Sequence, residues 1–166
     1  MALPAESFDP VPEAVPATVL HYLDQIGAIL QKLVTRDDAA DLLAIRLAPD
    51  MFDTALQFAI AIRFAARTMC PPTGQIAPDI PKQRDCHTLL GYKAQIADLI
   101  RPIRGTDMVF PVTHHAGQAV LTQEAVDYAI RFALPNMMFH TSMAYAGLRH
   151  GGMAIGKADF DGLHAY

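Results

Sequence analysis

The stretch from Ala133 to Phe160, ALPNMMFHTSMAYAGLRHGGMAIGKADF, decides the fold of this chain. An apolar stripe that begins at Val126 continues through its first half with helical spacing and ends near Gly151-Gly152. Residues that recur at this spacing lie on one face of a helix, and that face is usually buried. His140 lies on the stripe. The sequence therefore predicts a long final helix that directs a largely buried histidine between helices.

Apolar residues recur in the same way in earlier segments. They predict long helices over 13–35, 49–69 and 84–103, a short helix over Ala39–Leu47, and the final helix over 122–150. Pro49 suits the first turn of its helix, and Pro135 should kink the final helix because it removes a backbone hydrogen bond. Four long helices favour one all-α domain over residues 1–166, folded as an antiparallel four-helix bundle.

The segments between these helices have a different composition. Residues 1–12 predict an extended lead-in, and the proline-rich residues 71–81 predict a loop. Between 107 and 121, short apolar runs on both sides of Thr113–Gly117 predict a hairpin or another ordered connection. Thr122 then has the right side chain to cap the final helix.

A glycine-rich tail follows the final helix. Gly151 and Gly152 are typical of a helix C-terminus. We expect Lys157 and Asp159 to fasten the tail to the helices, with Phe160 inserted as an apolar plug.

The composition excludes several classes of protein. The net charge of −4 and the pI near 5.9 argue against a nucleic-acid partner, which needs a basic surface. No apolar run reaches the roughly 18 residues of a membrane span, and the first residues lack the features of a secretory signal. A cytoplasmic protein is expected. In that compartment Cys70 and Cys86 are expected to be free buried thiols, although they flank the 71–81 loop and a disulfide is the alternative.

The proportions of apolar and charged residues, 52% and 18%, predict surface that a second copy of the chain covers. Alanine-rich stretches such as Ala55–Ala66 carry apolar side chains on more than one face. A homodimer through the first or second long helix is therefore expected.

His140 is the leading candidate for a functional residue. Asn136 lies one turn before it and could orient it, or could satisfy the carbonyl groups that Pro135 frees. The alternative for His140 is a neutral core histidine with one hydrogen-bond partner. Asp50 is either a charge near a helix N-terminus or an acid of the site, and Tyr145 is a packing or rim residue.

A polar strip on the second long helix supplies a further candidate. Gln57 lies four residues after Asp53, and Arg63 and Arg67 continue the strip. A solvated helix face explains all four residues, and Gln57 is the member that could also face a site.

Two segments carry a resemblance to a known family: LAPDMF at Leu47–Phe52, and the stretch from Ala133 to Phe160. Through them the chain resembles the DinB/YfiT-like four-helix-bundle superfamily over about 13–161, in a branch classed as a domain of unknown function. The resemblance implies an up-down-down-up bundle, often a homodimer. Several relatives bind a divalent metal through three histidines, one on the second helix and an H-x-x-x-H pair on the last. Some are thiol-dependent transferases or isomerases.

This sequence departs from that triad. Matching the turn at Leu148-Arg149 with Gly152 places His140 on the second histidine of the pair and Asn136 on the first. The second helix has no histidine, and Gln57 is its nearest polar candidate. One histidine and two amides make a poor site for zinc or nickel. We therefore expect no resident metal.

The function predicted from these residues is a small-molecule pocket around His140, Asn136 and Gln57, with Asp50 and Tyr145 as further candidates. A metal-assisted or thiol-dependent transferase or isomerase, with His140 as one ligand, is the enzymatic alternative. A non-catalytic dimeric structural protein is the third.

A second histidine string imitates the metal motif. His114-His115-Ala116-Gly117-Gln118 resembles the H-H-x-G-Q string of metal-binding relatives, but Pro111 stands where the first histidine of the pair would be. Adjacent residues also point in different directions in regular structure. This string is expected to be a polar hairpin tip.

Overall fold

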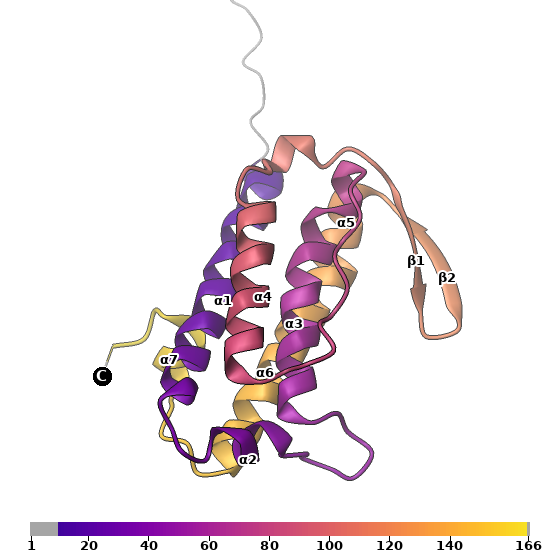
Figure 1. Ribbon diagram of the computed structural model, residues 1–166. Coiled ribbons are helices and arrows are strands. Elements are labelled where there is room, and N and C mark those ends of the chain that lie inside the picture. Colours follow the sequence, from indigo (N-terminus) through magenta and orange to yellow (C-terminus); the bar gives the residue numbers. More distant parts are fainter. Residues whose placement is uncertain (1–9, 166) are drawn as a thin grey trace, which may run out of the picture.

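The computed structural model describes the backbone of residues 10–165 and the side chains of residues 13–165. The chain is mainly helical, as predicted (Figure 1). The helices are α1 (Pro10–Val34), α2 (Ala39–Ala44), α3 (Thr54–Met69), α4 (Cys86–Ile100), α5 (Ala125–Tyr128), α6 (Leu134–His150) and α7 (Lys157–Asp161). Two strands, β1 (Val112–Ala116) and β2 (Ala119–Gln123), precede α5, and 3₁₀ turns form at Pro71–Thr73 and Gly105–Asp107.

The four long helices α1, α3, α4 and α6, here called the helical body, lie side by side (Figure 1). α1 and α6 run in one direction, and α3 and α4 run in the other. α3 and α4 are therefore parallel neighbours, and both are antiparallel to α1 and α6. These two helices are parallel because residues 71–85 return along the helical body before α4 begins. The order is up-down-down-up, as the resemblance implies.

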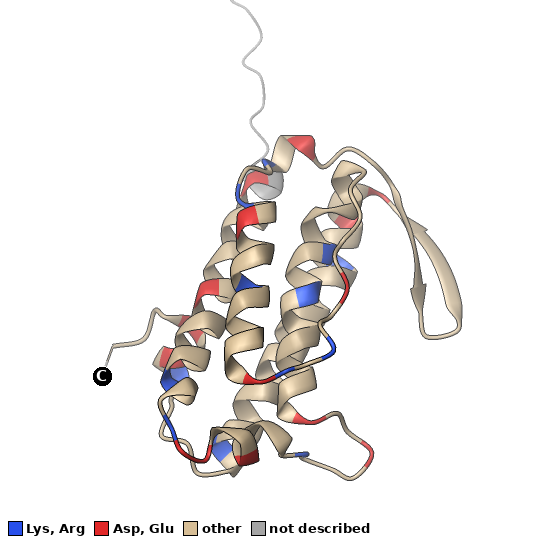
Figure 2. Ribbon diagram, in the orientation of Figure 1, with Lys and Arg blue, Asp and Glu red and all other residues tan. Residues whose placement is uncertain are grey.

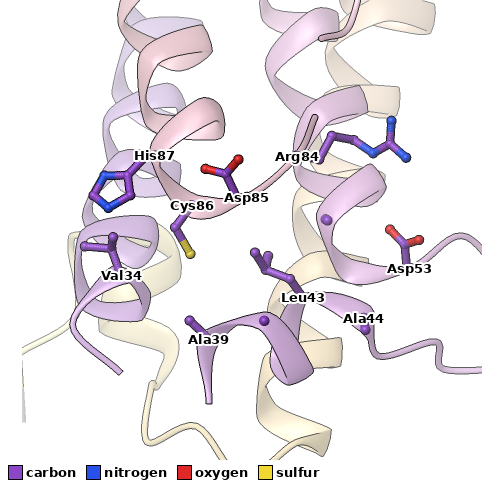
Figure 3. A pocket seen from close by; sticks show the side chains of 11 residues that line it. Val34, Ala39, Leu43, Ala44, Asp53, Arg84, Asp85, Cys86 and His87 are labelled. Carbon is purple, nitrogen blue, oxygen red and sulfur yellow. The ribbon is translucent and has the colours of Figure 1, made fainter. Parts of the chain in front are cut away.

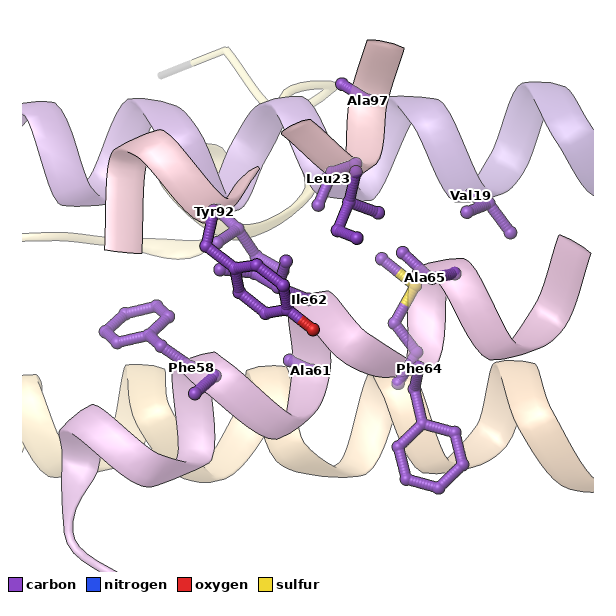
Figure 4. Packing of buried hydrophobic residues seen from close by; sticks show 14 of the residues in the cluster. Val19, Leu23, Phe58, Ala61, Ile62, Phe64, Ala65, Tyr92 and Ala97 are labelled. Carbon is purple, nitrogen blue, oxygen red and sulfur yellow. The ribbon is translucent and has the colours of Figure 1, made fainter. Parts of the chain in front are cut away.

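α3 is the central helix because it contacts α1, α4 and α6. Most of its side chains are buried, including the alanines between Ala55 and Ala66. Figure 4 shows Phe58 and Ile62 packed with Leu23 of α1 and Tyr92 of α4. The wide apolar surface of α3 is thus largely covered within the chain, so its alanine-rich pattern does not require a second copy of the chain. Charged residues lie on outer faces and in connections (Figure 2).

Two expected helix starts differ from the structure. α3 begins at Thr54 instead of residue 49, because the Asp53 carboxylate accepts a hydrogen bond from the Leu56 amide at 2.8 Å and caps the helix there. Pro49 and Asp50 lie in the preceding loop. α1 begins at Pro10, so residues 10–12 are helical instead of extended, and the rest of the predicted lead-in lies outside the described residues.

The last long helix is continuous but changes its pitch. Residues Ala129–Ala133 form a π-helical turn between α5 and α6, directly before Pro135. Pro135 has no N–H group to donate to the preceding turn, and next to it the Asn136 side-chain amide donates to the Phe132 carbonyl at 2.7 Å. Thr122 does not cap this helix because it lies in β2, paired with Thr113.

The segment before α5 contains the expected hairpin. β1 pairs antiparallel with β2, with His114 opposite Leu121, and Gly117 at the turn has a φ of 61°. Positive φ favours glycine, which explains the residue at this position.

The tail completes the fold by covering α1 and α6. The Phe160 ring lies 5.9 Å from the Tyr22 ring of α1 and 5.8 Å from the Tyr145 ring of α6. Asp159 forms an ion pair with Lys32. The predicted plug and the fastening role of Asp159 are therefore confirmed, whereas Lys157 is exposed.

Two further observations concern the chain as a whole. Cys70 and Cys86 are both free and buried, as expected. Across the described residues, helices of the length and apolarity that a bilayer crossing requires are not found.

Candidate functional site

His140 of α6 and Gln57 of α3 meet between the two helices. The His140 Nδ1 atom lies 2.7 Å from the Gln57 Oε1 atom. Gln57 is 4% exposed and His140 is partly buried, with its ring directed between α3 and α6 as expected. The imidazole is held at one end by a buried amide and remains accessible at the other.

The hydrogen bond to Gln57 sets the chemistry of the imidazole. Because the Gln57 oxygen accepts, Nδ1 carries the proton, and Nε2 is left with a free lone pair. Among the described residues, no hydrogen-bond partner of Nε2 is found. Burial lowers the pKa of His140, which favours the neutral ring. The site therefore offers an accessible hydrogen-bond acceptor that can also act as a base.

Two phenyl rings form the apolar surroundings of this imidazole. The Phe64 ring of α3 stacks on it at 5.9 Å with an interplanar angle of 13°. The Phe139 ring meets it edge-on at 5.2 Å and is 53% exposed. Phe64 is buried, so a flat ligand could contact the exposed Phe139 ring.

A guanidinium group lies beyond Phe64. The Cζ atom of Arg67 is 4.7 Å from the Phe64 ring centre and 5.5 Å from the Phe132 ring centre. Its side chain is half-buried, and within the described part of the chain it has no carboxylate partner. The expected solvated face is therefore wrong for Gln57 and Arg67. A half-buried cation without an acid is a favourable place for an anion.

Two buried polar groups end this row of aromatic rings. Tyr128 is 0% exposed, and its hydroxyl makes no hydrogen bond of normal geometry within the described residues. Burial raises the pKa of Tyr128, and the nearby Arg67 guanidinium opposes that rise. The hydroxyl thus faces a cation without being fully satisfied by it.

The second of these groups is His114 of the hairpin, which is 6% exposed. Its Nε2 atom pairs with the Gln123 Oε1 atom at 2.8 Å, its Nδ1 atom is unpartnered among the described side chains, and its ring lies 4.0 Å from the Phe132 ring. The expected polar hairpin tip is therefore wrong for His114. The strand period of two, which places Val112 and His114 on one face, is the signal that could have found it.

The remaining sequence candidates do not join His140. Asn136 uses its amide nitrogen for the Phe132 carbonyl, the role predicted for it as a structural residue. Asp50 is exposed in the loop before α3, and Tyr145 packs against Phe160 of the tail. The structure thus brings together Gln57 and His140, adds Phe64, Phe139 and Arg67, and leaves Asp50 and Tyr145 elsewhere.

The residues present do not fit a divalent transition metal. No group of three or more His, Cys, Asp or Glu side chains that could hold a metal ion occurs within residues 13–165. At the position of the implied triad, the Nδ1 atom of His140 is already bonded to an amide oxygen. Zinc and nickel prefer several imidazole or thiolate donors, which this site does not offer.

The lowered pKa of His140 predicts a pH effect on stability. The unfolded chain binds a proton on this residue near pH 6.5, whereas the folded chain binds it only at lower pH. The free energy of unfolding should therefore fall as the pH decreases from 6.5 towards the folded-state pKa. Denaturation at several pH values, compared between the wild type and His140→Leu, measures this. An equal pH dependence in both proteins would contradict the prediction.

Comparisons with known proteins agree with this architecture. A family model described as "Domain of unknown function (DUF1993)" matches residues 13–161. The crystal structure of a DinB family member protein from Shewanella denitrificans matches with a TM-score of 0.75 and 25% sequence identity, and the match covers 91% of each chain. No curated protein matches significantly.

Proposed function

Because the chain belongs to the DUF1993 family and has a DinB-like fold, we propose that it is a four-helix-bundle protein that binds a small anionic organic molecule beside His140 and Gln57. The observation that carries the proposal is the Gln57–His140 hydrogen bond, which leaves Nε2 free on a partly buried ring. The amide occupies a position where the resemblance implies a metal ligand. The site therefore recognises its ligand through the imidazole and without a resident transition metal.

The surroundings of His140 define the class of ligand. A hydroxyl or N–H group of the ligand donates to the Nε2 atom, and a flat apolar part contacts the exposed Phe139 ring. A carboxylate lies at Arg67, which is separated from His140 by the Phe64 ring. An aromatic hydroxy acid has all three features.

Hydroxynaphthoate is a suitable probe of this proposal. Its binding by the wild type should weaken about 10- to 100-fold in Arg67→Met, because a charge-assisted hydrogen bond contributes about 1.5–3 kcal/mol. Arg101→Met removes the same charge from an exposed position of the chain and serves as the matched control. Titration calorimetry measures each affinity.

A second variant tests the role of the imidazole. His140→Leu should also weaken hydroxynaphthoate, while naphthoate, which lacks the donor group, should lose less affinity. Equal affinities in the wild type, Arg67→Met and His140→Leu would overturn the proposal. Stoichiometric zinc or nickel that survives dialysis of untagged protein would support the metal-assisted alternative instead.

We also propose that the protein is a cytoplasmic homodimer. Both cysteines are free, which suits a reducing compartment. Apolar side chains are exposed outside α3, among them Val120 and Leu121 of β2 and Ile130 before α6. Light scattering at micromolar concentration should give twice the chain mass of 18.1 kDa. A monomer mass without concentration dependence would exclude the dimer.

A further inference from the structure

A cavity lies at the start of α3, at the opposite end of this helix from Arg67 (Figure 3). Its volume is about 490 Å³, which lies within the usual range for sites of small organic ligands. It is bounded by the end of α1, by α2, and by the first residues of α3 and α4. None of the residues of the His140 site lines it.

The inner wall of this cavity is made of small apolar side chains. Ala39 and Leu43 of α2 and Ala55 of α3 face it, together with the Cys86 thiol of α4. Figure 3 shows this thiol directed towards α2. Because the alanines carry only methyl groups, the side chains leave space between helices that otherwise pack closely.

The charged groups at the rim are already occupied or balanced. Asp53 caps α3 through the Leu56 amide at 2.8 Å. Asp85 caps α4 through the Thr88 amide at 2.9 Å and the Thr88 hydroxyl at 2.7 Å. Asp53 also lies 3.5 Å from the Arg46 guanidinium, and Arg84 and Asp85 carry opposite formal charges at the rim, where the N-terminal ends of α3 and α4 add positive potential. The cavity therefore provides no strong counter-charge for an ionic ligand.

Cys86 contributes to the wall as a neutral thiol. It is 6% exposed, and burial raises its pKa, with the Asp85 charge as a second cause. A thiol with a raised pKa is a weak nucleophile at neutral pH. Its place in the cavity makes it a reporter of occupancy, not a reactive group.

From the volume, the apolar wall and the balanced rim, we propose that this cavity binds a neutral, largely apolar small molecule, such as an aromatic alcohol. Burial of apolar ligand surface drives the binding. This ligand class differs from the anionic class of the His140 site, so the two proposals succeed or fail separately.

The rate at which N-ethylmaleimide modifies Cys86 tests the proposal, with naphthalenemethanol as the probe ligand. Peptide mass spectrometry follows Cys86 and Cys70 separately. At a probe concentration ten times its Kd, modification of Cys86 should slow about tenfold, because the free fraction of sites falls accordingly. Cys70 is fully buried and does not line the cavity, so its modification should slow less. Naphthoate at equal concentration should protect Cys86 weakly.

Variants that fill the cavity provide the control. Ala39→Leu and, separately, Ala44→Leu place an extra apolar group at the cavity wall and should abolish the protection, whereas Ala94→Leu on the exposed side of α4 should retain it. Alanine and leucine have similar helix propensities, so all three variants should fold. Protection that persists in both filled variants, equal slowing of both thiols, or no slowing in the wild type would each overturn the proposal.

Discussion

Replacing Ile155 by alanine is expected to lower the free energy of unfolding by about 2–4 kcal/mol, because the change removes a buried aliphatic side chain and leaves a cavity. Ile155 is 2% exposed although it lies in the tail beyond α6. Its carbonyl also accepts a hydrogen bond from Arg149 at 2.7 Å, which holds the tail against the last long helix. Urea denaturation measures the change.

Leu163→Ala provides the matched control within the same tail. Leu163 is 77% exposed, so its replacement should change the free energy of unfolding by less than about 0.5 kcal/mol. A similar small effect for Ile155→Ala would show that the tail is an appendage that the helices do not need. The expected difference would instead show that the tail is part of the core.

The tail also illustrates what can be predicted from sequence. The composition of Gly156–Phe160 indicated a fastened segment, and the aromatic contacts of Phe160 and the ion pair of Asp159 confirm it. The periodic patterns located the long helices for the same reason: each has one strongly apolar face. The partners of α3 do not follow from its pattern, because a helix that is apolar on several sides can face either a partner chain or three helices of its own chain.

The boundaries were predicted less well because competing local signals decide them. Both Pro49 and Asp53 are typical of a helix start, and the hydrogen bond from Leu56 to the Asp53 carboxylate decides between them. The parallel direction of α3 and α4 depends on the path of residues 71–85. The Tyr92 hydroxyl donates a hydrogen bond to the Pro78 carbonyl at 3.3 Å and so fixes the loop against α4. The residues around Pro78 and Tyr92 carry no sequence signal of this contact.

The candidate site could be predicted in part. The sequence groups Gln57 with His140 and Asn136 in one predicted pocket, and the structure places Gln57 and His140 2.7 Å apart but turns Asn136 to the Phe132 carbonyl. The aromatic row was missed because its members come from different elements: Phe64 from α3, Phe132 from the π-helical turn and His114 from β1. Arg67 was assigned to a solvated face because its spacing on α3 is typical of one. Only the three-dimensional structure shows that the Arg67 guanidinium lies over the Phe64 and Phe132 rings.

The close contact of α3 and α6 depends on a glycine. A Cβ atom built on Gly147 of α6 would lie 2.3 Å from the Thr54 Oγ1 atom at the start of α3. That hydroxyl donates to the Ile45 carbonyl at 3.1 Å, so moving it away would break a hydrogen bond. Gly91 of α4 is the opposite case, because a Cβ atom there would have no neighbour within 4 Å.

The same substitution at these two glycines should therefore have effects of opposite sign. Gly91→Ala should raise the free energy of unfolding by about 0.5–1 kcal/mol, since alanine loses less backbone entropy in a helix. Gly147→Ala has the same entropic advantage. The steric overlap with Thr54 should outweigh it and lower the free energy of unfolding by about 1–3 kcal/mol. Thr54→Ser should relieve part of that cost in the double variant, because serine rotates more freely than a β-branched residue. Equal stabilisation at both positions would contradict the prediction, because it would mean that α3 and α6 can move apart at Gly147 without any loss of stability.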